Sequence, residues 1–361
     1  MQMTKEQKDK MLSERGIVVY DRIKPSVKKY NTVSLFSGIG GFDLGFMYAG
    51  FNVIWANDFE KFACETYTEN VGNHIVCGDI RIEKEKIKPH DVLIGGFPCQ
   101  PFSTLGKLQG FDDKAGRGTL FFQITDIIQK HDTKLVVLEN VKNIMNHNNG
   151  ETFKRIIREL EEIGYKPYYH VFNSQNYGVP QRRNRCYIVA FNKKYFDNLP
   201  EKNEDFPFPE KEFQETDERL NTLKMLDKDV PAKYFLTKKI VKTIMGKGTK
   251  NYIVNPTIDL PISKTLTATM HKMHRASQDN YVTDEKNFAK CSSEEKEKRV
   301  SLRKLTPNEC RQLQGFPPDW KQVVSDCQAY KQFGNAVTVN VSYALADVLF
   351  NFIEKNKKGN W

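Results

Sequence analysis

The sequence predicts an α/β fold in which a doubly wound, mostly parallel sheet is joined to a second, smaller domain. Three observations lead to this prediction. Between residues 32 and 191, short apolar runs typical of buried strands alternate with helix-like segments. A glycine-rich turn directly follows the first of these runs. From about residue 192 to 330 the alternation stops, and prolines, lysines and irregular runs predominate.

The apolar runs place seven strands in the first part of the chain. They are expected at 32–36, 52–56, 74–77, 92–94 and 135–138, with 168–172 and 186–191 as a pair that closes the sheet. The helix after the glycine turn should run through Leu44, Phe46 and Met47 and stop at Gly50, because glycine readily adopts the left-handed conformation that ends helices. Strands separated by helices indicate parallel pairing.

Two further helices are expected near the C-terminus. Thr306 suits an N-cap, Pro307 the first helical position and Glu309 a capping box, so a helix should run from there to Gly315. A second, amphipathic helix over 340–355 should pack back on the sheet. The expected division is a basic N-terminal extension (1–30), a main α/β domain (31–194), a smaller domain (195–330) and a returning C-terminal helix (331–361).

Composition narrows the class of protein. The formal net charge of +10 favours a polyanionic partner such as nucleic acid. Seven cysteines without a CxxC pair argue against a disulfide framework and a structural zinc site. No apolar run approaches the roughly 18 residues that span a bilayer, and the polar N-terminus lacks a secretory signal. A cytoplasmic protein with reduced thiols and no membrane contact is therefore expected.

Cys99 stands directly after the fourth expected strand. Gly95, Gly96 and Pro98 stop that strand abruptly, and residues just past the carboxyl end of a strand line the ligand crevice of an open α/β sheet. A thiol in this place is positioned to act as a nucleophile. The alternative is a small buried side chain, which is the usual state of a free cysteine.

The glycine turn and two acidic residues suggest a cofactor site. The turn at 36–41 joins a strand to a helix and lets backbone amides approach a ligand at the positive helix terminus. Asp58 ends the second strand, where a carboxylate could bind ribose hydroxyls, and Asp79 ends the third, where it could accept from an adenine amino group. These features indicate a nucleoside-bearing cofactor. The alternative is a structural turn with two solvated acids.

Glu139 and two arginines add acid–base and anion-binding chemistry. Glu139 ends the fifth strand, which should neighbour the strand that carries Cys99, and a carboxyl group recessed in a crevice can hold a proton near neutral pH. Arg183 and Arg185 share one face of the closing strand and could grip a carbonyl or a phosphate. The alternatives are an ordinary strand-end acid and a solvated basic strand entry.

A long polar loop separates Cys99 from Leu120. It contains four glycines together with Ser103, Lys107 and Arg117. Such a loop beside a nucleophile suggests a mobile lid that closes over substrate and contacts it, although a plain surface loop is the alternative.

These groups together suit one reaction, the methylation of cytosine at C5. C5 is a poor nucleophile until a thiolate adds to C6, and a proton or hydrogen bond at N3 assists that addition. A base inside a duplex must first be flipped out of the stack. A lid and a second basic domain match this task.

The sequence also resembles the DNA (cytosine-5) methyltransferases, particularly the bacterial enzymes of restriction–modification systems. The match covers about 32–191 and 303–350. It rests on six motifs in the family's order: Phe36-Ser37-Gly38-Ile39-Gly40-Gly41, Gly96-Phe97-Pro98-Cys99-Gln100, Glu139-Asn140-Val141, Gln181-Arg182-Arg183-Asn184-Arg185, Arg303-Lys304-Leu305-Thr306-Pro307 with Gln314-Gly315-Phe316-Pro317, and Gln332-Phe333-Gly334-Asn335-Ala336-Val337. The resemblance implies a Rossmann-like, S-adenosylmethionine-dependent methyltransferase fold with 31–194 as the catalytic domain and 195–330 as the target-recognition domain.

The resemblance further implies a role for each matched residue. Cys99 would be the nucleophile and Glu139 the partner of cytosine N3, with Arg183 and Arg185 supporting the active site and Asn140 holding the turn before Cys99. The S-adenosylmethionine pocket would comprise Phe36, Ser37, Gly38, Gly40, Asp58, Phe59, Asp79, Ile80, Pro98, Leu120 and Asn335. Asp58 stands where many relatives have Glu, which shortens its reach to the ribose hydroxyls.

DNA contacts are expected in the loop, at Ser103, Lys107 and Arg117, and in the recognition domain. There Thr265-Leu266 matches a dipeptide common in the family, and His271, Lys272, His274 and Arg275 are candidates for groove contacts. The segment 247–250 could hold phosphates. His271 and His274 have metal-ligand spacing, but no third ligand follows at a suitable distance, so no metal is expected.

Two other functions remain open from the sequence. One is a tRNA cytosine-5 methyltransferase on the same scaffold, which the long basic recognition segment and the lack of a Cys-Phe-Thr signature disfavour. The other is a catalytically silent DNA-binding regulator, although the catalytic residues are all present. A nicotinamide-dependent dehydrogenase would leave Cys99 and Glu139 without a role. The expected partners are double-stranded DNA and a cognate restriction endonuclease, for a monomer acting at the nucleoid in a bacterial or phage setting.

Overall fold

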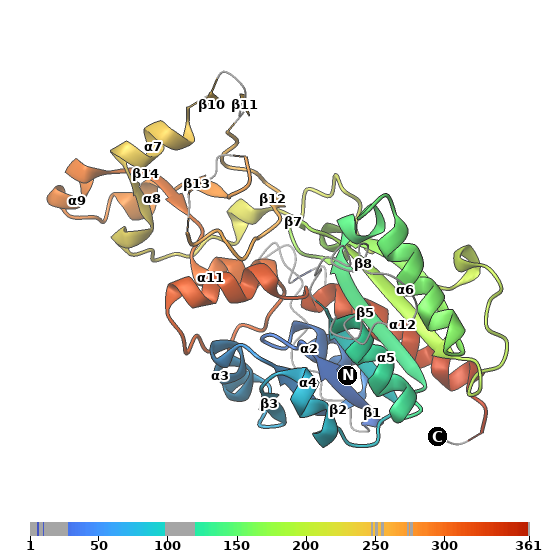
Figure 1. Ribbon diagram of the computed structural model, residues 1–361. Coiled ribbons are helices and arrows are strands. Elements are labelled where there is room, and N and C mark those ends of the chain that lie inside the picture. Colours follow the sequence, from blue (N-terminus) through green and yellow to red (C-terminus); the bar gives the residue numbers. More distant parts are fainter. Residues whose placement is uncertain are drawn as a thin grey trace.

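The computed structural model describes residues 6, 10, 28–97, 120–246, 248–249, 252–253, 256–272, 274 and 277–359. Its centre is a seven-stranded sheet in the order β3-β2-β1-β4-β5-β8-β6 (Figure 1). The strands are β1 (Lys29–Leu35), β2 (Phe51–Asp58), β3 (Ile75–Cys77), β4 (Val92–Gly96), β5 (Leu135–Val141), β6 (Tyr165–Asn173) and β8 (Asn184–Asn192). The first five pair in parallel, and β8 is antiparallel to both β5 and β6. The predicted doubly wound, mostly parallel sheet with a closing pair is confirmed.

Several strands extend beyond the apolar runs that predict them. β2 continues to Asp58 and β5 to Val141, so Glu139 and Asn140 lie within the ladder opposite residues of β8. Backbone hydrogen bonds do not depend on side-chain polarity, so the pairing continues past the last apolar residue. The strand ends therefore deliver polar side chains at a fixed register.

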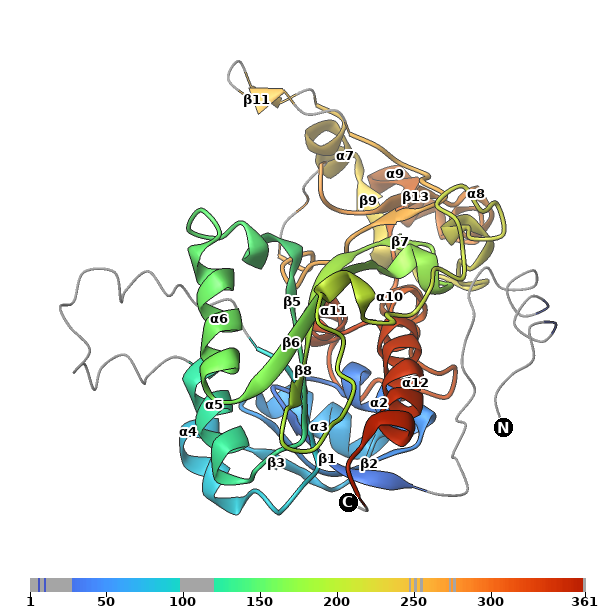
Figure 2. The same cartoon turned by 90° about the vertical axis from the view of Figure 1, so that its right-hand side faces the viewer.

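Helices cover both faces of the sheet (Figure 2). They are α2 (Gly41–Ala49), α3 (Lys61–Asn70), α4 (Ile80–Glu83), α5 (Leu120–Lys130), α6 (Glu151–Glu162) and α12 (Val339–Asn356). Apolar residues of α2 and α12 form one core with the sheet, and those of α5 and α6 form another core on the opposite face. The short elements of this part are η1 (Lys84–Lys86), η4 (Lys142–Met145), η5 (Ser174–Tyr177), η6 (Asn203–Asp205) and β7 (Gln181–Arg182).

The predicted helix ends are confirmed. Gly50 caps α2 in the left-handed conformation with a φ of 107°. Thr306 and Glu309 form the reciprocal capping box of α10 (Pro307–Leu313), and Gly315 has a φ of 74° just beyond its end.

The C-terminal helix is a core helix. By length and composition alone the stretch Asp326–Asn356 would be able to cross a membrane, contrary to the expectation that no run comes near that length, but 72% of its most apolar window is buried inside the fold. α12 packs against α2, where a Cβ added to Gly45 would lie 2.3 Å from the Ser342 hydroxyl oxygen. That close approach explains the glycine and places the apolar face of α12 against protein.

The smaller part of the molecule is built on a three-stranded antiparallel sheet in the order β13-β14-β9. Its elements are η7 (Thr222–Lys224), η8 (Ala232–Tyr234), β9 (Phe235–Thr237), α7 (Lys238–Ile244), β10 (Gly248–Thr249), β11 (Tyr252–Ile253), β12 (Ser263–Lys264), β13 (Tyr281–Thr283), α8 (Glu285–Phe288), α9 (Ser293–Lys298) and β14 (Arg299–Lys304). Figure 1 shows it beside the main sheet, with α11 (Asp326–Asn335) between them. The boundary predicted at residue 330 thus falls within α11, and the division into domains stays a prediction.

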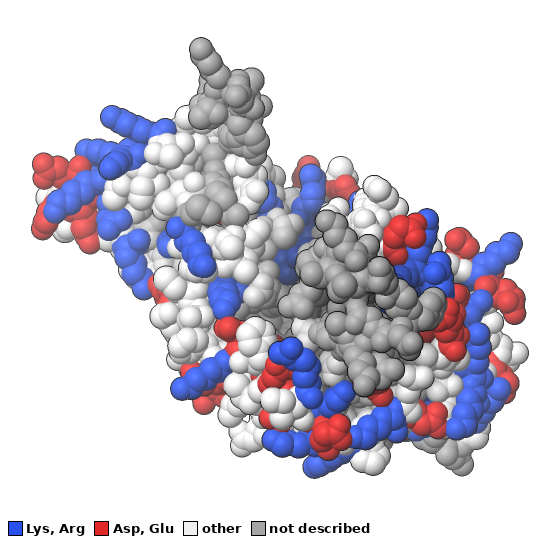
Figure 3. All heavy atoms as spheres, viewed as in Figure 1, with Lys and Arg blue, Asp and Glu red and all other residues white. Residues whose placement is uncertain are grey.

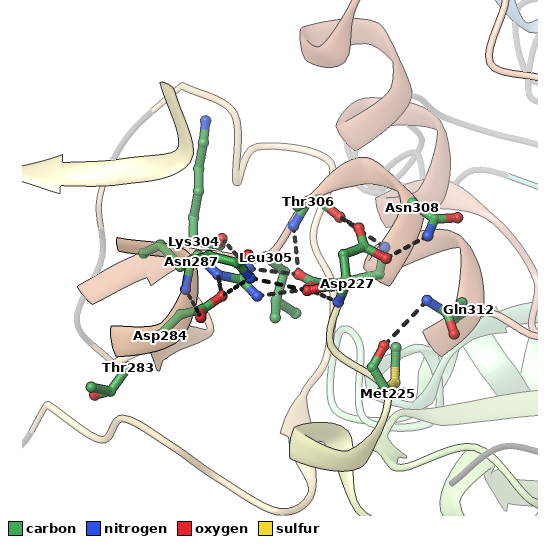
Figure 4. A network of polar contacts seen from close by, with 12 residues as sticks. Met225, Asp227, Thr283, Asp284, Asn287, Lys304, Leu305, Thr306, Asn308 and Gln312 are labelled. Carbon is green, nitrogen blue, oxygen red and sulfur yellow. Dashed lines mark hydrogen bonds and ion pairs between the residues drawn. The ribbon is translucent and has the colours of Figure 1, made fainter. Parts of the chain in front are cut away.

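A buried polar network joins the smaller sheet to α10. The Arg303 guanidinium, whose side chain is 0% exposed, pairs with Asp284 at 2.7 Å and with Glu309 at 2.8 Å. The backbone N–H of Asp227 donates to Glu309, and its carboxylate accepts from Thr306 and Asn308. Figure 4 shows Asp284 and Asn287 at the start of α8, Thr306 and Asn308 at the start of α10, and Asp227, all gathered around this network. The capping residues of α10 therefore also hold the smaller sheet in place.

Candidate active site

A cleft of about 630 Å³ opens where the parallel strands end. Most of the predicted cofactor residues and the predicted acid–arginine group line it together: Phe36, Ser37, Gly38, Asp58, Phe59, Asp79, Ile80, Leu120, Asn335, Glu139, Arg183 and Arg185. They come from segments far apart in the sequence: the carboxyl ends of the parallel strands, the start of the antiparallel β8 and the ends of α5 and α11 meet at one edge of the sheet.

The glycine turn is closed by the second strand. Ser37 N–H donates to Asn57 O at 3.0 Å, and Gly38 N–H donates to the Asp58 carboxylate at 2.8 Å. Gly38 has a φ of 55°, and a Cβ added there would meet nothing within 4 Å. The turn therefore leaves an open approach at Gly38, although the Gly38 amide itself is already bound to protein.

Gly40, which is expected in the cofactor pocket, is not among the residues that line the cleft, and its role there stays a prediction. It is the N-cap of α2 with a φ of 86°, and an added Cβ would lie 2.8 Å from Val71 Cγ2. Its glycine is required by backbone conformation and by close packing against α3. The motif that contains it marks a turn as much as a binding surface.

Asp58 and Phe59 form one wall of the cleft. The two oxygens of Asp58 accept from the Gly38 and Glu60 amides, and burial raises the pKa of this carboxyl above its ordinary value. Phe59 is 71% exposed, which is unusual for a large apolar ring. An exposed ring beside a buried carboxylate suits a flat heterocycle joined to a polyol.

Asp79 lies at the same end of the cleft in a more exposed place. It caps α4 through the Arg81 backbone N–H and also pairs with the Arg81 guanidinium, and this hydrogen bond lowers the pKa of Asp79. The carboxylate is thus ionised, and Arg81 engages both of its oxygens.

Glu139 and Arg185 form an ion pair at the other end of the cleft. Arg185 Nε lies 3.0 Å from Glu139 Oε1, and only 12% of the Glu139 side chain is exposed. Burial raises the pKa of Glu139, while the charges of Arg185 and Arg183 oppose that rise. Gly96, at the end of β4, is the ladder partner of Glu139, so the two strand ends are neighbours as the sequence predicts.

Arg183 lies deeper than Arg185 and is bound to the protein itself. Its side chain donates to the carbonyl oxygens of Leu266, Gly334 and Ala336 at 2.9, 3.2 and 2.8 Å. The residue is 2% exposed. Its terminal nitrogens are therefore engaged by three carbonyl groups from two segments of the chain, which a reading of the sequence did not foresee.

Part of the predicted site lies outside the described residues, namely Pro98, Cys99, Ser103, Lys107, Arg117 and Arg275, together with Lys247 and Lys250. The described chain leads up to the nucleophile's motif at Phe97, whose carbonyl oxygen accepts from Asn140 Nδ2 at 2.9 Å.

The described recognition residues Thr265, His271, Lys272 and His274 are not among those that line the cleft. The Thr265 hydroxyl donates to Arg182 O at 2.7 Å, and His274 stacks beside Tyr281 with ring centroids 6.1 Å apart. Lys272 and His274 are exposed and His271 is half-buried. Among the described residues, no group of three or more His, Cys, Asp or Glu side chains lies close enough to hold a metal ion.

Sequence reasoning missed part of the cleft rim. Lys331 pairs with Glu60 at 2.7 Å, and Gln332 Nε2 donates to Phe62 O at 2.9 Å, so α11 is tied to the start of α3 across the opening. Glu60 could have been predicted from the sequence, because it directly follows Asp58 and Phe59. Lys331 could not, because its position at the cleft depends on how α11 packs.

Comparisons with known proteins agree with this geometry. The model of the C-5 cytosine-specific DNA methylase family matches residues 30–351. The Type II methyltransferase M.SsoII of Shigella sonnei is 38% identical over 337 residues, covering 90% of this chain and 81% of that protein. M1.ScrFI of Lactococcus lactis subsp. cremoris is 37% identical over 341 residues, covering 91% and 80%.

Among solved structures, the chain resembles a Spodoptera frugiperda DNMT2 mutant with a TM-score of 0.69 and 22% identity, over 89% of this chain and 100% of that one. This likeness shows the fold. The family match, which covers both the cleft and the smaller part, shows more: the chain belongs to the C-5 cytosine-specific DNA methylase family and is a DNA (cytosine-5) methyltransferase.

Proposed function

We propose that the protein transfers a methyl group from S-adenosylmethionine to C5 of a flipped-out cytosine in a specific sequence of double-stranded DNA, through a covalent bond between Cys99 and C6. The observation that carries the proposal is the Glu139–Arg185 pair, which opens on the same cleft as Asp58 and Phe59. One cleft thus offers a protonatable carboxyl group at one end and a nucleoside-binding wall at the other.

The residues present suit S-adenosylmethionine. The exposed Phe59 ring offers a stacking face for adenine, and the free lone pairs of Asp58 can accept from ribose hydroxyls. The open approach at Gly38 leaves room for the rest of the molecule. When bound, this cofactor supplies the methyl group in its activated, sulfonium form.

The protein's own residues would prepare the base. Glu139, with its raised pKa, would hold a proton or hydrogen bond at N3 while the Cys99 thiolate adds to C6, and Arg185 would orient Glu139 and the cytosine carbonyl. C5 then acquires nucleophilic character and takes the methyl group. Loss of the C5 proton to a base and expulsion of the Cys99 thiolate restore the ring.

The biological setting follows from the relatives. Both are named Type II methyltransferases, so we propose that this enzyme protects DNA in the cytoplasm of a bacterial cell alongside a cognate endonuclease. We further propose that it acts as a monomer.

The test is methyl transfer from labelled S-adenosylmethionine to unmethylated genomic DNA and, separately, to total tRNA. Mass spectrometry of the nucleosides and bisulfite sequencing of the DNA should find 5-methyldeoxycytidine confined to one short sequence. Label in tRNA alone would reassign the enzyme to RNA, and label in neither would indicate a silent DNA-binding protein.

A second measurement tests the covalent step. A duplex with 5-fluorocytosine at the target position should become bonded to Cys99, because fluorine cannot leave as a proton does. The Cys99→Ser variant should form no adduct and transfer no methyl group. Substantial turnover by that variant would exclude the covalent route.

A further inference from the structure

A short segment of the smaller part is held against the main part by contacts from several directions. We name residues 263–268 the recognition seat, because they lead directly into the candidate groove residues at 271–274. Ser263 and Lys264 pair in parallel with Gln181 and Arg182, and Ser263 N–H donates to Pro180 O at 2.8 Å. The seat is therefore an added strand on the entry to β8.

Both backbone polar groups of Leu266 are hydrogen-bonded to buried side chains. Its N–H donates to Gln181 Oε1 and its carbonyl oxygen accepts from Arg183, each at 2.9 Å. Gln181 is 0% exposed and Leu266 2%. Because buried backbone groups need partners, a slip of the seat by one residue would leave these groups unsatisfied.

Arg183 connects the seat to the cleft wall. The same guanidinium that holds Leu266 also holds the carbonyl groups of Gly334 and Ala336, which line the cleft. A Cβ added to Gly334 would lie only 2.2 Å from the Thr267 carbonyl carbon, so the end of α11 and the seat are in direct backbone contact.

The opposite side of the seat is hydrogen-bonded to Asn280, the residue that precedes β13 of the smaller sheet. Lys264 N–H donates to Asn280 Oδ1 at 2.8 Å, and Asn280 Nδ2 donates back to Lys264 O at 3.1 Å, next to the start of β13. The seat thus pairs on one side with β7, which leads into β8, and is hydrogen-bonded on the other side to the smaller sheet.

We infer that Arg183 is a positioning residue that fixes the recognition seat relative to Glu139 and Arg185, and that it selects the target sequence through that register without touching the base. The inference deepens the proposed function and rests on it. Arg183 lies two residues before Arg185 on one strand, and its terminal nitrogens are occupied by main-chain carbonyls. A lysine keeps the charge but cannot span three carbonyl groups.

The test compares Arg183→Lys with Arg185→Lys and with Arg158→Lys, an exposed helix position as the matched control. The substrates are a duplex with the target sequence found by bisulfite mapping and duplexes with one base pair changed. In Arg183→Lys we expect discrimination in kcat/KM to fall by about 10-fold or more, mainly through KM for DNA, since a wrong base pair normally costs about 1–3 kcal/mol.

Arg185→Lys should show the opposite behaviour: methyl transfer from the bound complex should slow, while discrimination between target and altered sequences should stay intact. If Arg183→Lys behaves in that way instead, Arg183 acts at the base and the inference is wrong. A control that matches wild type confirms that arginine-to-lysine exchange alone has no such effect.

Asn280→Ala provides an independent variant in case Arg183→Lys fails to fold. This substitution removes the hydrogen bonds between the seat and the smaller sheet without altering the cleft. It should also lower the discrimination between target and altered DNA sequences. Unchanged discrimination in folded Asn280→Ala would overturn the inference. All these comparisons require that the wild-type protein methylates DNA. If the wild type does not, the proposed function is contradicted, and the result does not concern Arg183.

Discussion

Asp58 and Arg183 have structural duties in addition to the roles that their motifs suggest. Asp58 accepts from the amide of Gly38 and so shapes the turn that it was expected to accompany. Arg183 binds three main-chain carbonyls rather than facing open space. At the scale of single residues, motif matching finds the right side chains, and the hydrogen-bond partners decide what each one does.

Replacement of Glu139 by Gln tests the acid–base group directly. Gln is isosteric, but it cannot hold a transferable proton at N3. We expect methyl transfer from the bound complex to slow by about 10²-fold or more, with little change in DNA affinity. Single-turnover rates and binding isotherms measure the two effects separately. A collapse of affinity with a normal rate in the bound complex would make Glu139 a binding residue.

At the scale of elements, the Arg303 network joins β14, α8 and α10 (Figure 4). Arg303→Leu would leave the carboxylates of Asp284 and Glu309 buried without their cation. We expect a loss of about 3–5 kcal/mol in the free energy of unfolding, measured with denaturant. The exposed Lys298→Leu, which breaks the pair with Glu294, should cost less than about 1 kcal/mol.

The double variant Arg303→Leu/Glu309→Gln provides the internal check. Neutralising Glu309 removes part of the buried charge, so the double variant should be more stable than the sum of the single changes predicts. Strict additivity would show that Arg303 and Glu309 are not coupled.

Asp43 links α2 to β1 and α3. Its carboxylate accepts from the Ser34 and Tyr67 hydroxyls at 2.9 and 2.7 Å, directly beneath the glycine turn. Burial raises the pKa of Asp43 from 3.8 to about 6. Because the folded value is the higher one, the group stabilises the fold fully below the unfolded pKa, and this contribution is lost as the pH rises through about 6.

Asp43→Asn should remove that pH dependence. Between about pH 4 and pH 7, we expect the unfolding free energy of wild type to fall relative to the variant by up to ~3 kcal/mol. Denaturant titrations of both proteins across this range measure the difference. Parallel curves would show that Asp43 does not titrate there.

At the scale of the whole molecule, positive and negative side chains alternate on the face that Figure 3 presents. Figure 3 shows Lys and Arg side chains on the smaller part and along the lower rim of the main part, with Asp and Glu between them. The net charge of +10 agrees with a nucleic-acid partner but does not by itself place the DNA. The seat and the cleft meet at Gly334 and Arg183. This contact fixes the position of the predicted DNA-contacting segment relative to the predicted catalytic residues.

The sequence by itself determined the order of the strands along the chain, the helix caps at Gly50 and Thr306, and the cleft side chains that stand at the strand ends, because local periodicity, cap chemistry and strand-end position act over a few residues. The tertiary structure alone decided that β8 lies antiparallel between β5 and β6, that Lys331 reaches Glu60, and that Arg183 binds Leu266. These contacts join residues far apart in the chain, and only the packing of the whole molecule brings such residues together.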